Sequence, residues 1–135
     1  MGHITGTVAI TPLPKEDIWI TDEAFSYIFE DMGIRTTIPK GFRTDGASIP
    51  RLFWRIIGHP FEPKVARAAV VHDYLYSKEC DLVMDRKKAD RAFRNILKSD
   101  GVGVIKRNLM YFGVRVGGWA TFCKNNEWTL NNIIN

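Results

Sequence analysis

The sequence predicts an α+β domain in which a small antiparallel N-terminal sheet is followed by three helices. Short β-branched and aromatic runs, bounded by Pro, Asp or Gly, occupy the first part of the chain. Beyond residue 60 the apolar residues recur with the 3.6-residue period of helices. The 135 residues, 45% of them hydrophobic and 25% charged, suit a single globular domain, residues 1–135, with one core.

The strands come first. Four are expected at residues 7–10, 18–20, 25–29 and 35–38. No segment between them is long enough for the helical crossover that parallel neighbours need, so we expect antiparallel pairing. Pro39 and Gly41 are predicted to end the sheet, and the turn-rich segment 41–50 is predicted to connect it to the helices.

The helices follow. After a short helix at 51–57, Pro63 favours the start of a helix that runs to about Ser77. Asp85 is the predicted N-cap of the next helix, which Gly101 ends. The apolar face of this helix consists of Ala89, Ala92, Phe93, Ile96 and Leu97. A third helix is expected from about residue 102 to 124. Strands and an active-site loop then occupy about 5–57, helices 61–124 and a tail 125–135.

Composition narrows the functional classes. A net charge of +4 permits an anionic partner without demanding one, and there is no specific nucleic-acid signal. Cys80 and Cys123 are too few for a disulfide framework and lack zinc-site spacing. We expect no transmembrane segment and no signal peptide, and therefore synthesis as a cytosolic, soluble product.

The segment 64–76 is apolar nearly all round, so His72 and Asp73 are expected to be partly buried. Burying a carboxylate costs several kcal/mol unless it is paired, hydrogen-bonded or metal-bound. Asp90 lies at the edge of the apolar face of its own helix. If the two helices pack antiparallel, Asp90 reaches one imidazole nitrogen of His72 and leaves the other to accept a proton.

Neighbouring residues extend this site. Tyr76, one turn after His72, is expected to hydrogen-bond the same carboxylate. Asp73 lies about 100° round the helix from His72 and points toward a place where a cation can bind. Asp45 adds a second carboxylate, and Gly46 allows a sharp turn that presents carbonyl oxygens. Such oxygen ligands suit calcium.

Each of these interpretations has a plainer alternative. His72 and Asp90 equally form a buried polar network that fixes helix packing. Asp45 is equally explained as a turn residue whose side chain caps its own backbone. Ser48, His72 and Asp90 also compose a Ser-His-Asp set, but no Gly-x-Ser-x-Gly elbow surrounds the serine.

Three motifs together resemble a bacteriophage and prophage family of unknown function. They are the segment 41–51, which contains TDGASIPR, the segment 68–76, which contains HDYLY, and ADxxF at 89–93, which Met110-Tyr111 follows. The resemblance covers roughly residues 5–120. It implies a viral or prophage origin and no particular activity.

A second resemblance covers motifs only. HDxxY at 72–76, followed by ADRA at 89–92, is similar to the two catalytic helices of secreted phospholipases A2. This resemblance implies that His72 is a general base, that Asp73 binds calcium and that Asp90 orients His72.

The segment 44–48 is similar to the aspartate–glycine calcium loop of the small bacterial and fungal phospholipases. This similarity implies that Asp45 and the Gly46 carbonyl are calcium ligands. The sequence departs from that family by lacking a helix-linking disulfide and a glycine-rich calcium loop of the animal type, and by adding a sheet.

Two main functions remain open. The first is a calcium-assisted ester hydrolase in which His72 activates water, Asp90 and Tyr76 orient it, and Asp73 with Asp45 holds the cation. Its favoured substrate is a phospholipid, such as one of a host envelope. The second is a non-enzymatic virion component of a tail or neck, which packs against other virion proteins. A third is an intracellular effector that acts on a host factor.

Overall fold

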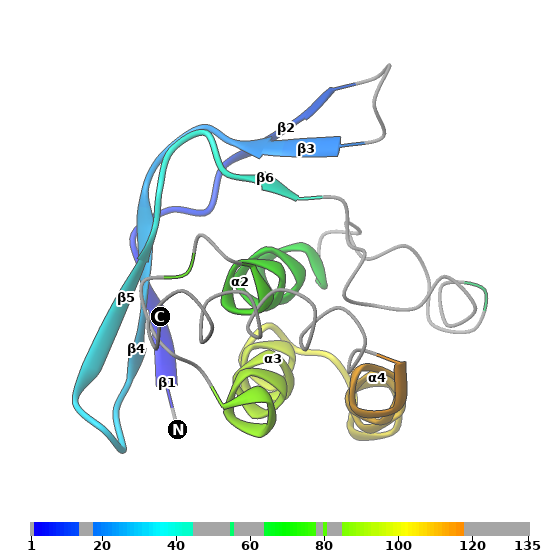
Figure 1. Cartoon of the computed structure of the whole chain (residues 1–135). Helices are drawn as coiled ribbons and strands as arrows, with labels where there is room; N and C mark the ends of the chain where they lie inside the picture. The colour runs from blue at the N-terminus through cyan, green and yellow to red at the C-terminus, as the bar shows by residue number, and fades with distance from the viewer. Residues whose placement is uncertain are drawn as a thin grey trace, which may run out of the picture.

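The structure, a computed structural model, describes residues 2–13, 18–44, 55, 64–77, 80 and 85–117. It confirms the α+β class, because two small antiparallel sheets precede the described helices (Figure 1). The described strands are β1 (Gly2–Thr5), β2 (Ile10–Leu13), β3 (Ile18–Thr21), β4 (Phe25–Phe29), β5 (Ile34–Ile38) and β6 (Arg43–Thr44). The described helices are α2 (Ala66–Tyr76), α3 (Arg86–Ser99) and α4 (Val104–Gly117).

Each sheet has three strands. β4 is the central strand of the first sheet, between β1 and β5, and Phe25 of β4 lies opposite Ile38 of β5. Phe25, Tyr27 and Phe29 alternate along β4 and are all buried, as expected for the core-facing side of a strand. β3 is the central strand of the second sheet, between β2 and β6. The two sheets lie on two sides of α2 (Figure 1).

The expected strands at 18–20, 25–29 and 35–38 are confirmed, but the strand expected at 7–10 is wrong. Residues 7–9 belong to no strand, and strands lie on either side of them. Gly6 has a φ of 93°, a conformation that glycine adopts easily. The chain turns there and passes from the first sheet to the second, so the β-branched residues that follow Gly6 connect two strands.

The sheet does not end at Pro39 and Gly41, because β6 follows and pairs with β3. Gly41 has a φ of 83°, and its N–H donates to the carbonyl of Thr21 at 2.9 Å. The N–H of Phe42 donates to the Thr21 hydroxyl, also at 2.9 Å. These bonds to the end of β3 return the chain beside that strand, and the sequence pattern did not reveal them.

The helices form a layer in which α2 lies between the sheets and α3, and α4 packs on α3 (Figure 1). His72 of α2 contacts Asp90 near the start of α3, and Arg67 of α2 pairs with Asp100 beyond its end at 3.6 Å. The end of α2 therefore lies beside the start of α3, and the start of α2 lies beside the end of α3. The two helices are antiparallel, as predicted. Eight of the 11 residues of α2 are buried because the helix is covered from several sides.

The ends of α3 are as predicted. Asp85 is the N-cap, and its side chain accepts a hydrogen bond from the N–H of Lys87 at 3.0 Å. Gly101 follows the helix with a φ of 87°. The third predicted helix is confirmed over the described α4. Several predictions concern residues outside the described ones: 118–124, the tail 125–135, Ser48, Cys123 and, apart from Arg55, the helix expected at 51–57. Within the described part of the chain, no helix has the length and apolar character needed to cross a membrane.

Candidate functional site

His72 lies in the middle of α2, after a run of buried apolar residues. Its exposed fraction is 0%. Two aromatic rings flank the imidazole. The ring centroid of Tyr76 is 4.2 Å away, and that of Phe93 from α3 is 4.9 Å away. Packing on both rings holds the imidazole in one place.

Asp90 is also 0% exposed, and its Oδ1 lies 2.7 Å from Nε2 of His72. This confirms the predicted contact between the two residues. An ionised carboxylate only accepts hydrogen bonds, so Nε2 carries a proton. In the neutral imidazole Nδ1 then carries the lone pair, which is the arrangement that the sequence predicts for a general base.

Two further side chains bind the Asp90 carboxylate. The Tyr76 hydroxyl donates to Oδ1, as predicted. Arg115 of α4 donates to Oδ2 at 2.8 Å, a contact that the sequence analysis missed. The Arg115 side chain is 31% exposed, so one end of the network reaches the surface. Nothing in the sequence distinguishes Arg115 from the other arginines on the helices.

The network determines the charge state of its members. Burial by itself raises the pKa of the Asp90 carboxyl, but the hydrogen bond and charge of His72, with the bonds from Tyr76 and Arg115, outweigh burial and hold that pKa below its usual range. Burial, followed by the bond to Asp90 and its charge, raises the pKa of Tyr76. Asp90 is therefore an anion at neutral pH, and Tyr76 stays protonated and donates.

The carboxylate of α2, that of Asp73, is half-buried. Its Oδ2 accepts a hydrogen bond from the hydroxyl of Thr44, the last residue of β6. β6 therefore ends beside Asp73. Asp45 and Gly46 themselves lie outside the described residues. Among the residues that are described, no three His, Cys, Asp or Glu side chains form a group with metal-site geometry.

The described geometry thus brings together His72, Tyr76 and Asp90, adds Arg115, and places Asp73 beside the start of the predicted calcium loop. A histidine whose protonated nitrogen is held by a buried carboxylate suits proton transfer, because the carboxylate stabilises the imidazolium that forms. The same bonds also join the buried side chains of α2 and α3 to one another, which suits a packing role.

Comparison with known proteins places this site in a family. Residues 19–114 match the family model described as "Protein of unknown function (DUF1353)". The matched range includes His72, Tyr76 and Asp90 and ends just before Arg115. The uncharacterized protein y4jT of Sinorhizobium fredii (strain NBRC 101917 / NGR234) is 36% identical over 109 residues, which cover 80% of this chain and 30% of that protein. The uncharacterized protein y4iH of the same strain is 33% identical over 115 residues, 84% of this chain and 46% of that protein. This chain thus spans less than half the length of these curated relatives, and no solved structure matches it.

Proposed function

We propose a function for this chain, which belongs to the DUF1353 family of proteins of unknown function, from its buried histidine site. The proposed activity is calcium-assisted hydrolysis of an ester, with phospholipid as the favoured substrate class. The observation that carries the proposal is the 2.7 Å contact between Nε2 of His72 and the buried carboxylate of Asp90. Together with the predicted calcium loop, this contact supports a reaction in which His72 removes a proton from water.

Each member of the network has a role in that reaction. Nδ1 of His72 accepts the proton of a water molecule as the water attacks the ester carbonyl. Asp90 stabilises the imidazolium cation that this transfer creates. Tyr76 and Arg115 hold Asp90 in place and keep it ionised. These two are positioning residues, since they act through the carboxylate.

The proposed calcium ligands are Asp73, Asp45 and the carbonyl of Gly46. Carboxylate and hydroxyl oxygens meet where Thr44 contacts Asp73, and hard oxygen donors are the kind that calcium prefers. When bound, a calcium ion stabilises negative charge that develops on the carbonyl oxygen of an ester. The half-buried position of Asp73 beside Thr44, the residue that precedes Asp45 in the sequence, supports this ligand set.

A second candidate is a non-enzymatic packing module, such as a virion component of a tail or neck. The observation that favours it is that His72 and Asp90 are both 0% exposed. Hydrolysis needs water beside His72, whereas a network that only fixes helix packing needs none. We also propose the phage or prophage origin that the sequence motifs suggest. For the hydrolase, the proposed location of the substrate is a host envelope.

The test uses the purified chain with vesicles of mixed phospholipids and with short-chain esters. Fatty-acid release is measured in calcium and in excess chelator. We expect release only with calcium, and we expect Asp73→Asn to raise the calcium concentration needed for half-maximal release by about tenfold or more. The matched control Asp31→Asn lies on the turn after β4 and should leave this concentration unchanged. If release is absent, or is equal in calcium and in chelator, the hydrolase proposal fails.

A further inference from the structure

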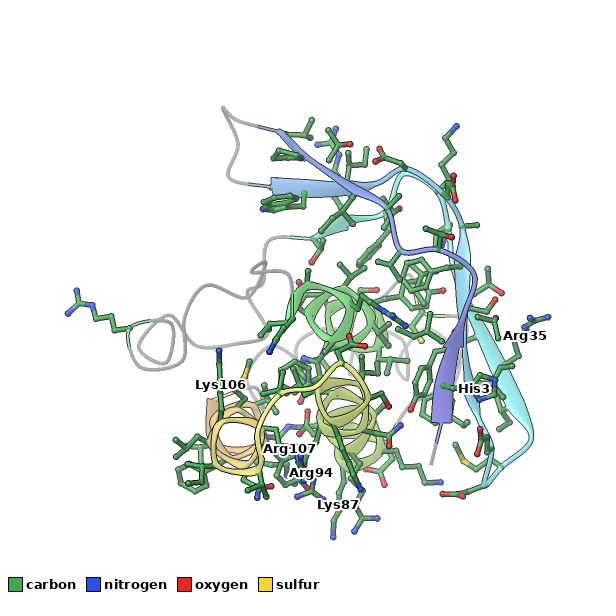
Figure 2. All side chains as sticks on the ribbon, turned by 180° about the vertical axis from the view of Figure 1, so that it is seen from behind. His3, Arg35, Lys87, Arg94, Lys106 and Arg107 are labelled. Carbon is green, nitrogen blue, oxygen red and sulfur yellow. The ribbon has the colours of Figure 1, made fainter. Side chains whose placement is uncertain are left out.

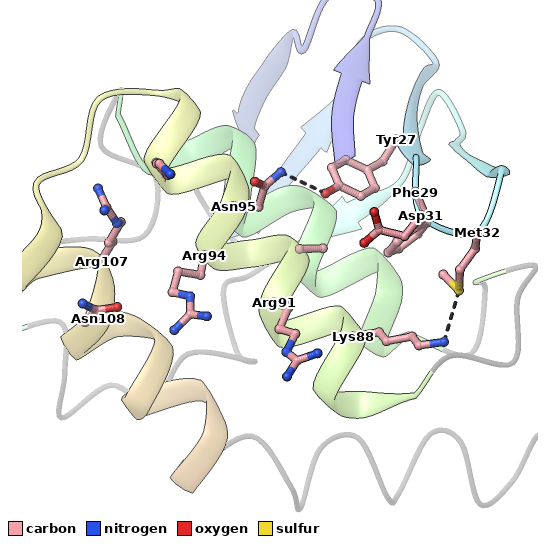
Figure 3. Close-up of a pocket in the computed structure, with 12 residues that line it drawn as sticks. Tyr27, Phe29, Asp31, Met32, Lys88, Arg91, Arg94, Asn95, Arg107 and Asn108 are labelled. Carbon is pink, nitrogen blue, oxygen red and sulfur yellow. Dashed lines mark hydrogen bonds between the residues drawn. The ribbon is translucent and has the colours of Figure 1, made fainter. Parts of the chain in front are cut away.

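A second candidate site lies on the solvent side of α3, away from the apolar face that packs on α2. It is a surface pocket of about 450 Å³ between the end of β4, α3 and the start of α4 (Figure 3). Pockets of this size hold small organic ligands. Its lining residues are Tyr27, Phe29, Asp31, Met32, Lys88, Arg91, Ala92, Arg94, Asn95, Lys98, Arg107 and Asn108.

The pocket wall is strongly positive. Five of its residues carry positive charge and only Asp31 carries negative charge; the five are Lys88, Arg91, Arg94, Lys98 and Arg107. Figures 2 and 3 show Arg94 and Arg107 close together where α3 meets α4. So many like charges around one hollow repel each other, and an anionic ligand relieves that repulsion.

The described contacts of these side chains do not neutralise their charge. Nζ of Lys88 lies 3.1 Å from the sulfur of Met32, a weak acceptor. The Arg94 guanidinium stacks 4.1 Å over the ring of Tyr111. Nη1 of Arg107 donates to the Val102 carbonyl at 3.3 Å. The contacts with Met32, Tyr111 and Val102 orient the three cations and leave them as cations.

The spacing of the charges suits phosphate. Lys88, Arg91 and Lys98 lie at i, i+3 and i+10 of α3, so successive cations follow one face over about 15 Å of helix. A phosphate or diphosphate places two or more negative charges within a few ångströms, whereas a single carboxylate supplies one. Arginine, which supplies three of the five cations, binds phosphate oxygens with two parallel N–H donors.

We infer that this pocket binds a small organic phosphate that carries at least two negative charges. The organic part of the ligand faces the apolar lining from Phe29, Met32 and Ala92. Beside that lining, Nδ2 of Asn95 lies 3.4 Å from the Tyr27 hydroxyl, and the half-buried Asn95 amide offers polar atoms to the ligand. The inference does not depend on the proposed hydrolysis.

A nucleic-acid strand fits the pocket less well. Nonspecific single-strand binding relies on exposed aromatic rings on which successive bases stack. The two aromatic side chains of β4 that line the pocket, Tyr27 and Phe29, are 1% and 7% exposed, and they pack edge to face on each other. Neither ring offers an open face for stacking. A compact phosphate remains the ligand that matches both the charge and the shape.

The test is isothermal titration calorimetry of the full chain with ADP, pyrophosphate and adenosine. We expect ADP to bind with one site per chain, pyrophosphate to compete with it, and adenosine to bind at least tenfold more weakly. Arg91→Gln combined with Lys98→Gln removes two exposed cations and should weaken ADP binding about tenfold or more. The matched control combines Lys64→Gln with Lys87→Gln, which changes the net charge equally outside the pocket and should leave the affinity within twofold.

Several results would overturn the inference. It fails if ADP does not bind at millimolar concentration, or if adenosine binds as well as ADP. It also fails if the pocket variant and the control variant lose affinity equally, because the binding then depends only on net charge. Competition between ADP and vesicles that contain phosphatidic acid shows the source of the phosphate. Displacement of ADP by the vesicles indicates a lipid phosphate, and no displacement indicates a soluble one. Binding of a ten-nucleotide RNA at least 100-fold more tightly than ADP, with the same loss in the pocket variant, would replace the small phosphate by a nucleic acid.

Discussion

Arg115 donates to one oxygen of the Asp90 carboxylate at 2.8 Å, while the other oxygen binds His72 at 2.7 Å. One buried carboxylate therefore joins α4 to α2 through α3. This arrangement means that any change of Asp90 affects both the packing of three helices and the proton balance of the histidine. Activity and stability must therefore be measured together in every variant of the network.

Tyr76→Phe should lower the free energy of unfolding. The change removes the hydroxyl that donates to Asp90 and leaves a buried carboxylate with one hydrogen bond fewer, at a cost of about 1.5–3 kcal/mol. Urea unfolding at pH 7 measures this difference. Tyr111→Phe is the matched control, since the Arg94 guanidinium contacts the face of that ring rather than its hydroxyl. Equal stability of Tyr76→Phe and the wild type would mean that the hydroxyl contributes nothing to the network.

The pH dependence of stability should report the state of Asp90. Its pKa is lowered in the folded chain, so its contribution is complete above the unfolded value of about 4 and is lost as the pH falls through the folded pKa. Arg115→Gln removes one of the groups that lower this pKa. The variant should therefore lose stability at a higher pH than the wild type during acid unfolding.

The matched control for Arg115→Gln is Arg91→Gln, which makes the same charge change on the outer face of α3. Urea unfolding between pH 5 and pH 2.5 measures both variants. Acid unfolding of Arg115→Gln at the same pH as Arg91→Gln would show that the guanidinium does not act on Asp90.

Asp100→Asn should stabilise the chain at neutral pH. Burial raises the pKa of Asp100, against the opposing charge of Arg67, and its Oδ2 has no hydrogen-bond partner among the described residues. A raised pKa means that the stability contribution is present at low pH and is lost as the pH rises through the folded pKa. Asp100 also lies at the C-cap of α3, where a negative charge costs about 0.5 kcal/mol.

Thermal unfolding measures the effect of Asp100→Asn. We expect a higher melting temperature than the wild type at pH 7 and no difference near pH 3, where the wild-type carboxyl is protonated. A lower melting temperature at pH 7 would mean instead that the 3.6 Å ion pair with Arg67 outweighs the cost of burial.

Gly2→Ala should destabilise the edge of the first sheet. A Cβ at Gly2 collides with the Tyr27 hydroxyl and the Ile28 carbonyl, so the strand must shift, at a cost of about 1–3 kcal/mol. The carbonyl of Gly2 also accepts a hydrogen bond from Asn95 at 2.6 Å, which such a shift weakens. Gly103→Ala is the control, because a Cβ there meets nothing within 4 Å. Equal stability of Gly2→Ala and Gly103→Ala would rule out the collision.

The sequence predicted contacts that follow from helix periodicity. The contact of His72 with Asp90 could be predicted because each residue has a fixed place on its helix and a short connection makes the helices antiparallel. Arg115 and Thr44 could not be predicted in the same way. Their contacts depend on how α4 crosses α3 and on how the chain returns to β3 after Gly41, and a single sequence carries no local pattern for either.

Strand boundaries were predicted less well for a related reason. Residues 7–10 have the β-branched character of a strand, but the positive φ of Gly6 turns the chain between two sheets. The basic pocket escaped prediction because its cations, taken one at a time, look like the solvated face of α3. Only the approach of β4 and α4 encloses them.

The most direct test of the proposed hydrolysis compares the wild type with His72→Gln in calcium-dependent fatty-acid release from mixed phospholipid vesicles. Glutamine keeps much of the size and an N–H donor for Asp90, but it cannot accept and release a proton near neutral pH. The account predicts that kcat/KM falls about 100-fold or more while the variant remains folded, as thermal unfolding in parallel will show. Absence of calcium-dependent release by the wild type, together with a melting temperature several degrees lower in His72→Gln, would contradict the account and leave the packing module.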